Sequence, residues 1–255
     1  MLANRKNDSI LGTTKLRLPT VDSTNNYAAN LLKEQLLGHG TVILADEQTN
    51  GRGQRGSVWQ SEPGKNLQFS LVIFPDQFAI ADQRYLNSFV SLSLVEFLKK
   101  LGLAAKIKWP NDILVNSKKI AGILIENQLK SDRIHSSIVG VGFNVNQLNF
   151  NNLNATSLAV EMHRDFLLNE VLDSLLHQMN STYDLLKSNR FSDLDEAYFQ
   201  NLWGYRELKK FQDQHGIFEG TIQGISPEGL LLIDVENEFQ RSYDIKELTF
   251  LLEEE

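Results

Sequence analysis

The stretch KIKWPNDILVNSKKIAGILIENQLKSDRIHSSIVGVGFNVN, residues 106–146, decides the fold. It contains four runs rich in apolar and β-branched residues, and we predict a β-strand in each of residues 106–109, 112–116, 119–126 and 133–146. The segment Asn116-Ser117-Lys118 between two of these runs predicts a tight turn. We therefore expect a β-sheet in this part of the chain.

Helical and further strand patterns lie on both sides of this stretch. Apolar residues recur at helical spacing over residues 85–101, and Gly102 is typical of the position after a helix end. Asp22-Ser23-Thr24-Asn25 supplies residue types that cap the start of the next predicted helix. The remaining predictions are strands at 16–21, 41–45 and 66–74 and helices at 157–161, 165–186 and 193–200.

The character of the chain changes near residue 205. From there, short alternating runs are separated by glycines and other turn residues, a spacing that predicts a small β-barrel. We therefore predict two domains, a body of helices and strands over residues 1–204 and a β cap over residues 205–255. Residues 1–15 show no pattern and are expected to form a lead-in.

Composition excludes several classes of protein. The 255 residues include no cysteine, which excludes disulfides, thiolate zinc sites and a cysteine nucleophile. The net charge of −7 lacks the overall basic character of many nucleic-acid-binding proteins. The N-terminus has no apolar signal-peptide core, and the apolar runs are too short to span a membrane. We expect a cytoplasmic protein with no membrane or DNA partner.

A glycine-rich loop over residues 46–65 is the first candidate for chemistry. Gly51, Gly53 and Gly56 match the dinucleotide fingerprint G-x-G-x-x-G, but no helical pattern follows the glycines, so this interpretation is rejected. The loop does place backbone N–H groups beside Arg52 and Arg55, which is one way to bind a carboxylate or phosphate. A flexible charged loop with no ligand is an equal alternative.

A second candidate is the run Lys108-Trp109-Pro110-Asn111-Asp112, followed by Lys118 and Lys119. Asn111 and Asp112 supply oxygens suited to magnesium, although for each residue taken singly a polar turn is the favoured explanation. The histidines lack metal-ligand spacing, and the nucleophile motif G-x-S-x-G is absent from the sequence. This inventory suits a reaction in which the substrate supplies the nucleophile and the protein positions charges.

Taken together, four motifs resemble those of biotin–protein ligases. They occur in the family's order over residues 16–147: Ser23-Thr24-Asn25, GRGQRGSVWQSEPGKNLQFS at 51–70, KWPNDILVNSKKIAGIL at 108–124 and GVGFNVN at 140–146. The resemblance implies an α+β fold, in which a mixed β-sheet is packed by helices as in class II aminoacyl-tRNA synthetases. It also implies a small C-terminal barrel like that of Src-homology-3 domains.

The resemblance implies a reaction in two steps. Biotin reacts with ATP, in the presence of Mg²⁺, to give biotinyl-5′-AMP, and biotin is then transferred to a lysine of a biotin carboxyl carrier protein domain. Arg52 and Lys119 would be the catalytic cations, and Asn111 and Asp112 the metal ligands. Biotin would contact Ser23, Thr24, Asn25, Gln48, Gly51, Arg52, Gly53 and Lys119. ATP would contact Gln54, Arg55, Trp59, Asn111, Lys119 and Asn144. Gln54 departs from the family, because many relatives have arginine there.

Three alternatives stay open beside this interpretation. A lipoate–protein ligase acting on a lipoyl carrier domain would share the fold, although the glycine loop and KWPND favour biotin. A sensor that binds biotinyl-adenylate would need the winged helix-turn-helix of the family's bifunctional members. Only about 15 unpatterned residues precede the first predicted strand, so we expect the short monofunctional type. A non-catalytic scaffold is the third alternative, and a homodimer is compatible with all of them.

Overall fold

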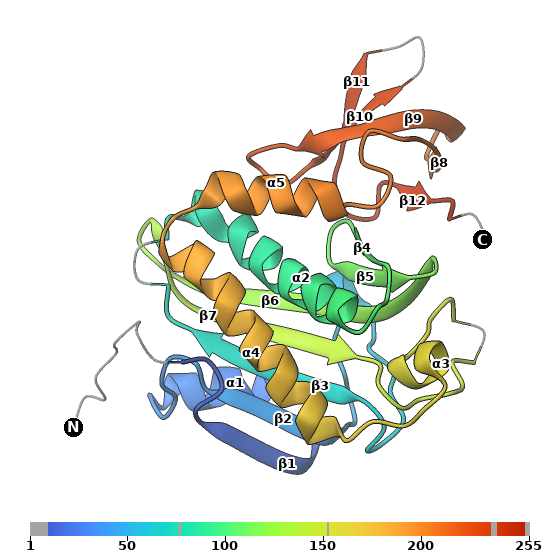
Figure 1. Cartoon of the computed structure of the whole chain (residues 1–255). Helices are drawn as coiled ribbons and strands as arrows, with labels where there is room; N and C mark the ends of the chain where they lie inside the picture. The colour runs from blue at the N-terminus through green and yellow to red at the C-terminus, as the bar shows by residue number, and fades with distance from the viewer. Residues whose placement is uncertain (1–9, 76–77, 152, 236–238, 253–255) are drawn as a thin grey trace.

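The computed structural model describes residues 10–75, 78–151, 153–235 and 239–252, so the first nine residues of the expected lead-in lie outside it. A seven-stranded sheet in the order β1-β2-β3-β7-β6-β5-β4 forms the body of the protein (Figure 1). Only β1 and β2 pair in parallel among the described strands, so the predicted mixed sheet is confirmed. The strands are β1 (Lys15–Val21), β2 (Val42–Gln48), β3 (Leu67–Ile73), β4 (Ala105–Lys108), β5 (Asp112–Val115), β6 (Lys118–Lys130) and β7 (Arg133–Phe143).

Local sequence accounts for the hairpins at the centre of the sheet. Asn116 and Ser117 both adopt positive φ, at 48° and 59°, which is the backbone of the two-residue turn that twisted hairpins favour. They join β5 to β6, where the sequence predicted a tight turn. β6 and β7 then pair along most of their length, with Ala121 opposite Phe143 and Lys130 opposite Arg133. Continuous apolar runs therefore became strands buried on at least one face.

Helices cover the two faces of the sheet unequally. Helices α2 (Gln83–Lys100), α4 (Leu168–Lys187) and α5 (Phe191–Asn201) lie over one face and enclose the main core, which includes Phe69, Phe89 and Phe143 (Figure 1). On the other face α1 (Thr24–Lys33) packs Ala28 against Ile43, Val72 and Ile138. The remaining described helices are the short α3 (Leu158–Met162) and two 3₁₀ turns, Gln54–Gly56 and Ile80–Asp82.

Helix α4 begins three residues later than the sequence pattern indicates. The side chain of Asn146 donates a hydrogen bond to the Phe166 carbonyl (2.8 Å) and accepts one from the Phe166 N–H (2.9 Å). This pair of bonds fixes Phe166 in the preceding loop, so α4 starts at Leu168. Among the described residues, no helix is both long enough and apolar enough to cross a lipid bilayer.

The C-terminal part folds as a second, five-stranded antiparallel sheet in the order β11-β10-β9-β8-β12, as the sequence predicted. Its strands are β8 (Leu208–Asp213), β9 (Gly216–Ile225), β10 (Leu231–Val235), β11 (Gln240–Tyr243) and β12 (Thr249–Phe250). The Trp203 N–H donates to the Ile107 carbonyl (2.7 Å), which ties the connection after α5 to the edge strand β4. The division between residues 204 and 205, which falls in this connection, stays a prediction.

A partly buried polar cluster joins α2 to α5. Arg84 pairs with Asp195 through both carboxylate oxygens (2.5 and 2.8 Å), and Tyr85 stacks on Phe191 with 4.0 Å between ring centroids. The side chains of Arg84 and Asp195 are only about a quarter exposed. Removing one partner of such a pair leaves the other charge poorly solvated.

We therefore predict that Asp195→Ala lowers the free energy of unfolding by about 1–3 kcal/mol, because Arg84 would lose its partner in a partly buried site. Urea unfolding followed by circular dichroism measures this change. Glu96→Ala is the matched control, since Glu96 pairs with Lys99 in an exposed position on α2, and such pairs contribute at most about 1 kcal/mol. Equal effects of the two substitutions would contradict the prediction.

Candidate active site

Glycines on β6 and β7 leave part of one face of the seven-stranded sheet, the face that carries α1, without side chains. A Cβ added at Gly142 would lie 2.3 Å from Cε2 of Trp59, and one at Gly140 would lie 2.5 Å from Oδ1 of Asn25. At Gly122 the added atom would lie 3.1 Å from the Lys119 ammonium. Other groups therefore occupy the space that side chains would fill.

The glycine-rich loop between β2 and β3 folds down onto this bare face. The Trp59 N–H donates to the Gly51 carbonyl (3.0 Å), and the Gly53 N–H donates to the Ser57 carbonyl (2.7 Å). Gly51 is required by packing, because a Cβ there would lie 2.5 Å from the Trp59 carbonyl oxygen. A 3₁₀ turn over Gln54–Gly56 forms the tip of the loop, and the strand β3 follows at Leu67. No helix opens after the glycines, in agreement with the rejection of a dinucleotide site.

The loop and the sheet enclose a cavity of about 330 Å³. Its lining includes most of the residues that the sequence singled out: Ser23, Thr24, Asn25, Gln48, Arg52, Gly53, Gln54, Trp59, Asn111, Asp112 and Lys119. The C-terminal part also reaches it, through Phe250 of β12 and through Ile245, Lys246 and Leu248 of the connection before β12. Segments distant in the sequence therefore converge on one space.

One end of the cavity has a floor of buried hydrogen-bonding groups. Thr24 donates to the Gln48 side-chain oxygen through its backbone N–H (2.7 Å) and its hydroxyl (3.1 Å). The hydroxyl of Ser70 lies 2.7 Å from that of Thr24 and 2.6 Å from Oδ1 of Asn25. Ser23 stands at the start of α1 but makes no side-chain capping bond. The first residues of α1, together with Gln48 of β2 and Ser70 of β3, thus supply this polar floor.

Two cations predicted from the sequence line the cavity, and each has a carboxylate partner. The Lys119 ammonium lies 2.6 Å from Asp112 and 5.5 Å from the ring centroid of Trp59. Lys108 shares Asp112 at 3.9 Å, and burial lowers the pKa of this lysine, although Asp112 opposes that change. Arg52 pairs with Glu126 at 2.7 Å.

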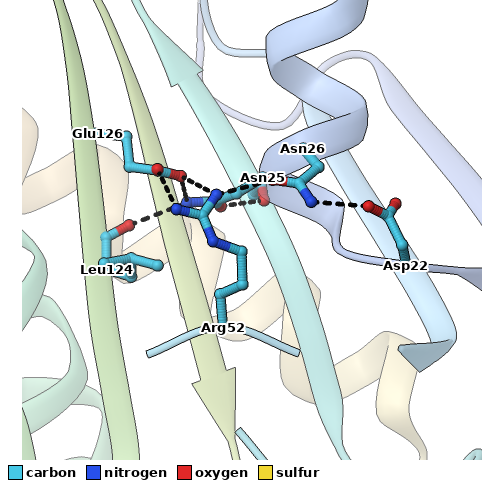
Figure 2. A network of polar contacts seen from close by, with 7 residues as sticks. Asp22, Asn25, Asn26, Arg52, Leu124 and Glu126 are labelled. Carbon is cyan, nitrogen blue, oxygen red and sulfur yellow. Dashed lines mark hydrogen bonds and ion pairs between the residues drawn. The ribbon is translucent and has the colours of Figure 1, made fainter. Parts of the chain in front are cut away.

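Arg52 belongs to a continuous polar network (Figure 2). Besides Glu126, its guanidinium donates to Oδ1 of Asn26 (2.7 Å), and the Asn26 amide donates to Asp22 (2.7 Å). The hydrogen bond from the Asn26 side chain is the main reason for the lowered pKa of Asp22. On the other side, the Asn25 amide donates to Glu126 (2.8 Å). The network therefore connects the cation to the polar floor.

Three predicted residues lie outside the cavity lining. Arg55 turns toward the C-terminal sheet, where it donates to Asp244 (2.5 Å) and to the Ile245 carbonyl (2.7 Å). The bond to Arg55 is the main reason for the lowered pKa of the Asp244 carboxyl. Asn144 is buried and donates to the Thr156 carbonyl (3.0 Å). Gly51 lies beneath Trp59, where packing explains its presence.

Comparisons with known proteins agree on one family. Residues 18–144 match the model of the Biotin/lipoate A/B protein ligase family. The chain is 30% identical over 228 residues to the bifunctional ligase/repressor BirA of Bacillus subtilis (strain 168), covering 87% of this chain and 70% of that protein. The structure of the Aquifex aeolicus biotin protein ligase in complex with biotin and ATP superposes with a TM-score of 0.75. That match has 30% identity and covers 93% of this chain and 98% of the other.

The chain belongs to the biotin–protein ligase family. A further relative, the biotin–[acetyl-CoA-carboxylase] ligase of Paracoccus denitrificans, is 38% identical over 131 residues, which is 50% of this chain and 53% of that one. The resemblance found in the four motifs is confirmed, and so is the α+β fold that it implied.

Several residues that line this family member's cavity, or contact its lining, were not found from the sequence. Glu126 looked like the end of an apolar strand, although its charge within that run was a usable signal. Ser70 and Gln68 contact the floor residues Thr24 and Gln48 from β3, where alternation along the strand places them on one face. The residues supplied by the C-terminal part carry no local sequence signal for this site.

The donor set near Asp112 bears on the expected magnesium ion. The described residues contain no cluster of three or more His, Asp or Glu side chains able to hold a metal. The side-chain N–H₂ of Asn111 donates to the Ile123 carbonyl (2.6 Å). Its side-chain oxygen is left as a potential metal ligand, next in sequence to the Asp112 carboxylate. This sparse set of oxygens fits magnesium that keeps water and substrate phosphates as its other ligands.

We predict that Gly142→Ala displaces the Trp59 indole, because the new Cβ would overlap the ring. The intrinsic tryptophan emission spectrum should change, and the change should vanish when the same substitution is made together with Trp59→Phe. Gly38→Ala is the control, since an added Cβ there meets nothing within 4 Å. An unchanged spectrum in Gly142→Ala would show that the indole does not lie on β7.

Proposed function

We propose that this protein is an ATP-dependent biotin–protein ligase that activates biotin as biotinyl-5′-AMP and transfers it to a lysine of a biotin carboxyl carrier domain. The observation that carries the proposal is that Arg52 and Lys119 line one cavity that also has a floor of hydroxyl and amide groups. A ligand with a polar head and a carboxylate tail matches that arrangement. Family membership supports the same conclusion.

The floor favours biotin over lipoate. The ureido ring of biotin offers two N–H donors and a carbonyl acceptor, which suit the hydroxyl of Thr24 and the side chains of Asn25 and Gln48. The dithiolane ring of lipoate offers no comparable donor or carbonyl acceptor and would form none of these hydrogen bonds. Polar sites of this kind discriminate strongly against a ligand that lacks the matching groups. The valeryl chain of biotin would then extend toward Arg52 and Lys119.

In the first step a carboxylate oxygen of biotin attacks the α-phosphorus of ATP. A new O–P bond forms, the bond from the α-phosphorus to the bridging oxygen breaks, and pyrophosphate leaves. The two reactants are anions, so their repulsion opposes the encounter. The cations of Arg52 and Lys119 offset this repulsion and the charge that develops on the phosphoryl oxygens. Asn111 and Asp112 would hold Mg²⁺ carried by the phosphates, and that ion would polarise the phosphoryl oxygens.

In the second step the ε-amine of the carrier lysine attacks the acyl carbon of the adenylate. The C–O bond to the phosphate breaks, AMP leaves, and the amine nitrogen loses its proton to solvent as the amide forms. Until then, the adenylate must be kept from water. Trp59 and the loop that carries it cover the bare sheet face, which would exclude water from the acyl group.

We predict that Arg52→Ala and Lys119→Ala each lower the rate of biotin transfer to a carrier domain by about 10²–10³-fold, because each removes a cation from the reacting anions. The measurement is ATP-dependent incorporation of labelled biotin into a purified carrier domain. Lys99→Ala, which removes an exposed lysine of α2, is the control and should retain full activity.

Two outcomes would contradict the proposed function. One is full activity in both cavity variants, which would mean that the cations take no part. The other is a wild-type protein that forms an adenylate from lipoate in preference to biotin, measured as pyrophosphate exchange with each acid. A shared loss of activity in Lys99→Ala would indicate a general defect instead of a defect of the cavity.

A further inference from the structure

The hydrogen bonds of Arg52 leave one edge of its guanidinium open. An arginine has five N–H donors arranged as a planar fork. Nη1 and Nη2 bind the two carboxylate oxygens of Glu126, at 3.3 and 2.7 Å, and the second N–H of Nη1 points to Asn26 at 2.7 Å. Within the described parts of the chain, the remaining edge, formed by Nε–H and the second N–H of Nη2, is given no hydrogen-bond partner. Such an edge suits bidentate pairing with a carboxylate.

Glu126, for its part, has both oxygens in use. Oε1 accepts from Arg52, and Oε2 accepts from Arg52 and from the Asn25 amide at 2.8 Å. The Asn25 amide also donates to the Leu124 carbonyl at 3.3 Å (Figure 2). The Asn25 side-chain oxygen accepts from the hydroxyl of Ser70. Both carboxylate oxygens of Glu126 are thus fixed by hydrogen bonds, and Glu126 orients the Arg52 guanidinium from strand β6.

We propose that Glu126 is a positioning residue that holds Arg52 with its open Nε/Nη2 edge toward the cavity, where that edge receives the carboxylate of biotin. The inference rests on the proposed function, since it assigns the substrate group that Arg52 binds. Glu126 touches neither reactant in this arrangement. It acts by fixing which edge of Arg52 is presented, so less orientation has to be gained when the substrate binds.

The opposite role for Glu126 gives the opposite result. If its carboxylate only occupied Arg52 until biotin displaced it, removing its charge would strengthen biotin binding. Simple Coulomb repulsion between two carboxylates also predicts stronger binding after that removal. The positioning role predicts weaker binding, because the guanidinium would lose its fixed orientation.

The test uses Glu126→Gln, which keeps the shape of the side chain but replaces one acceptor oxygen with an N–H₂ group that cannot accept from Arg52 or Asn25. Isothermal titration calorimetry measures the affinity for biotin and for biotin methyl ester, which lacks the negative charge. We expect biotin affinity to fall about tenfold, a typical coupling between contacting residues, and ester affinity to change less than twofold. Asp46→Asn is the matched control, because Asp46 pairs with Arg17 at 2.7 Å in a similarly exposed position and neither residue lines the cavity.

A second comparison shows whether Glu126 acts through Arg52. The double variant Arg52→Ala/Glu126→Gln should bind biotin as Arg52→Ala does, with no further loss. Unchanged or tighter biotin binding in Glu126→Gln would overturn the positioning role. So would equal losses for biotin and its ester, which would indicate an effect through Asn25 and the floor. A different pair of results would overturn the proposed function alone. In it, Glu126→Gln weakens biotin binding as expected, but the wild-type protein forms no adenylate from biotin and ATP. The positioning role of Glu126 would then still hold.

Discussion

The arrangement of the site depends on one steric constraint, which is the close approach of Trp59 to strands that carry no side chain. Gly142 and Gly122 leave room for the indole directly over β7 and β6. Because the loop can lie flat on the sheet, Arg52 is brought over β6 to reach Glu126, while Lys119 lies beside the indole. A larger residue at these glycines would lift the loop and move Arg52 away from Glu126 and the floor.

One face of the seven-stranded sheet packs the core, and the other face forms the cavity. Helices α2, α4 and α5 bury the apolar side chains of one face, and this packing fixes the strands. The other face carries α1, whose first residues Thr24 and Asn25 line the cavity together with the glycine loop. Polar groups that need defined positions thus stand on rigid strands and at a helix start, and only the covering segment is a loop.

The sequence predicted what depends on local pattern. Periodicity located most strands and helices within a few residues, and it identified residues 46–65 as an unusual loop because aliphatic residues are rare there. The direction of a side chain on that loop depends on tertiary contacts instead. Arg52 and Arg55 are three residues apart and alike in sequence, yet one lines the cavity and the other pairs with Asp244 of the C-terminal sheet. Glu126 was missed for the same reason, since its importance comes from a partner 74 residues away.

The charges of the cavity explain how a protein of net charge −7 can be suited to the two anionic substrates proposed for it. Arg52 pairs with Glu126 and Lys119 pairs with Asp112, so both cations are fixed in place, while Lys108 and Lys246 also line the cavity and leave it with an excess of positive charge. Salt screens the attraction that this positive charge exerts on anions at long distances. Binding relies on short-range complementarity between pre-oriented donors and the ligand. Such a site favours a carboxylate at one defined position over negative charge in general.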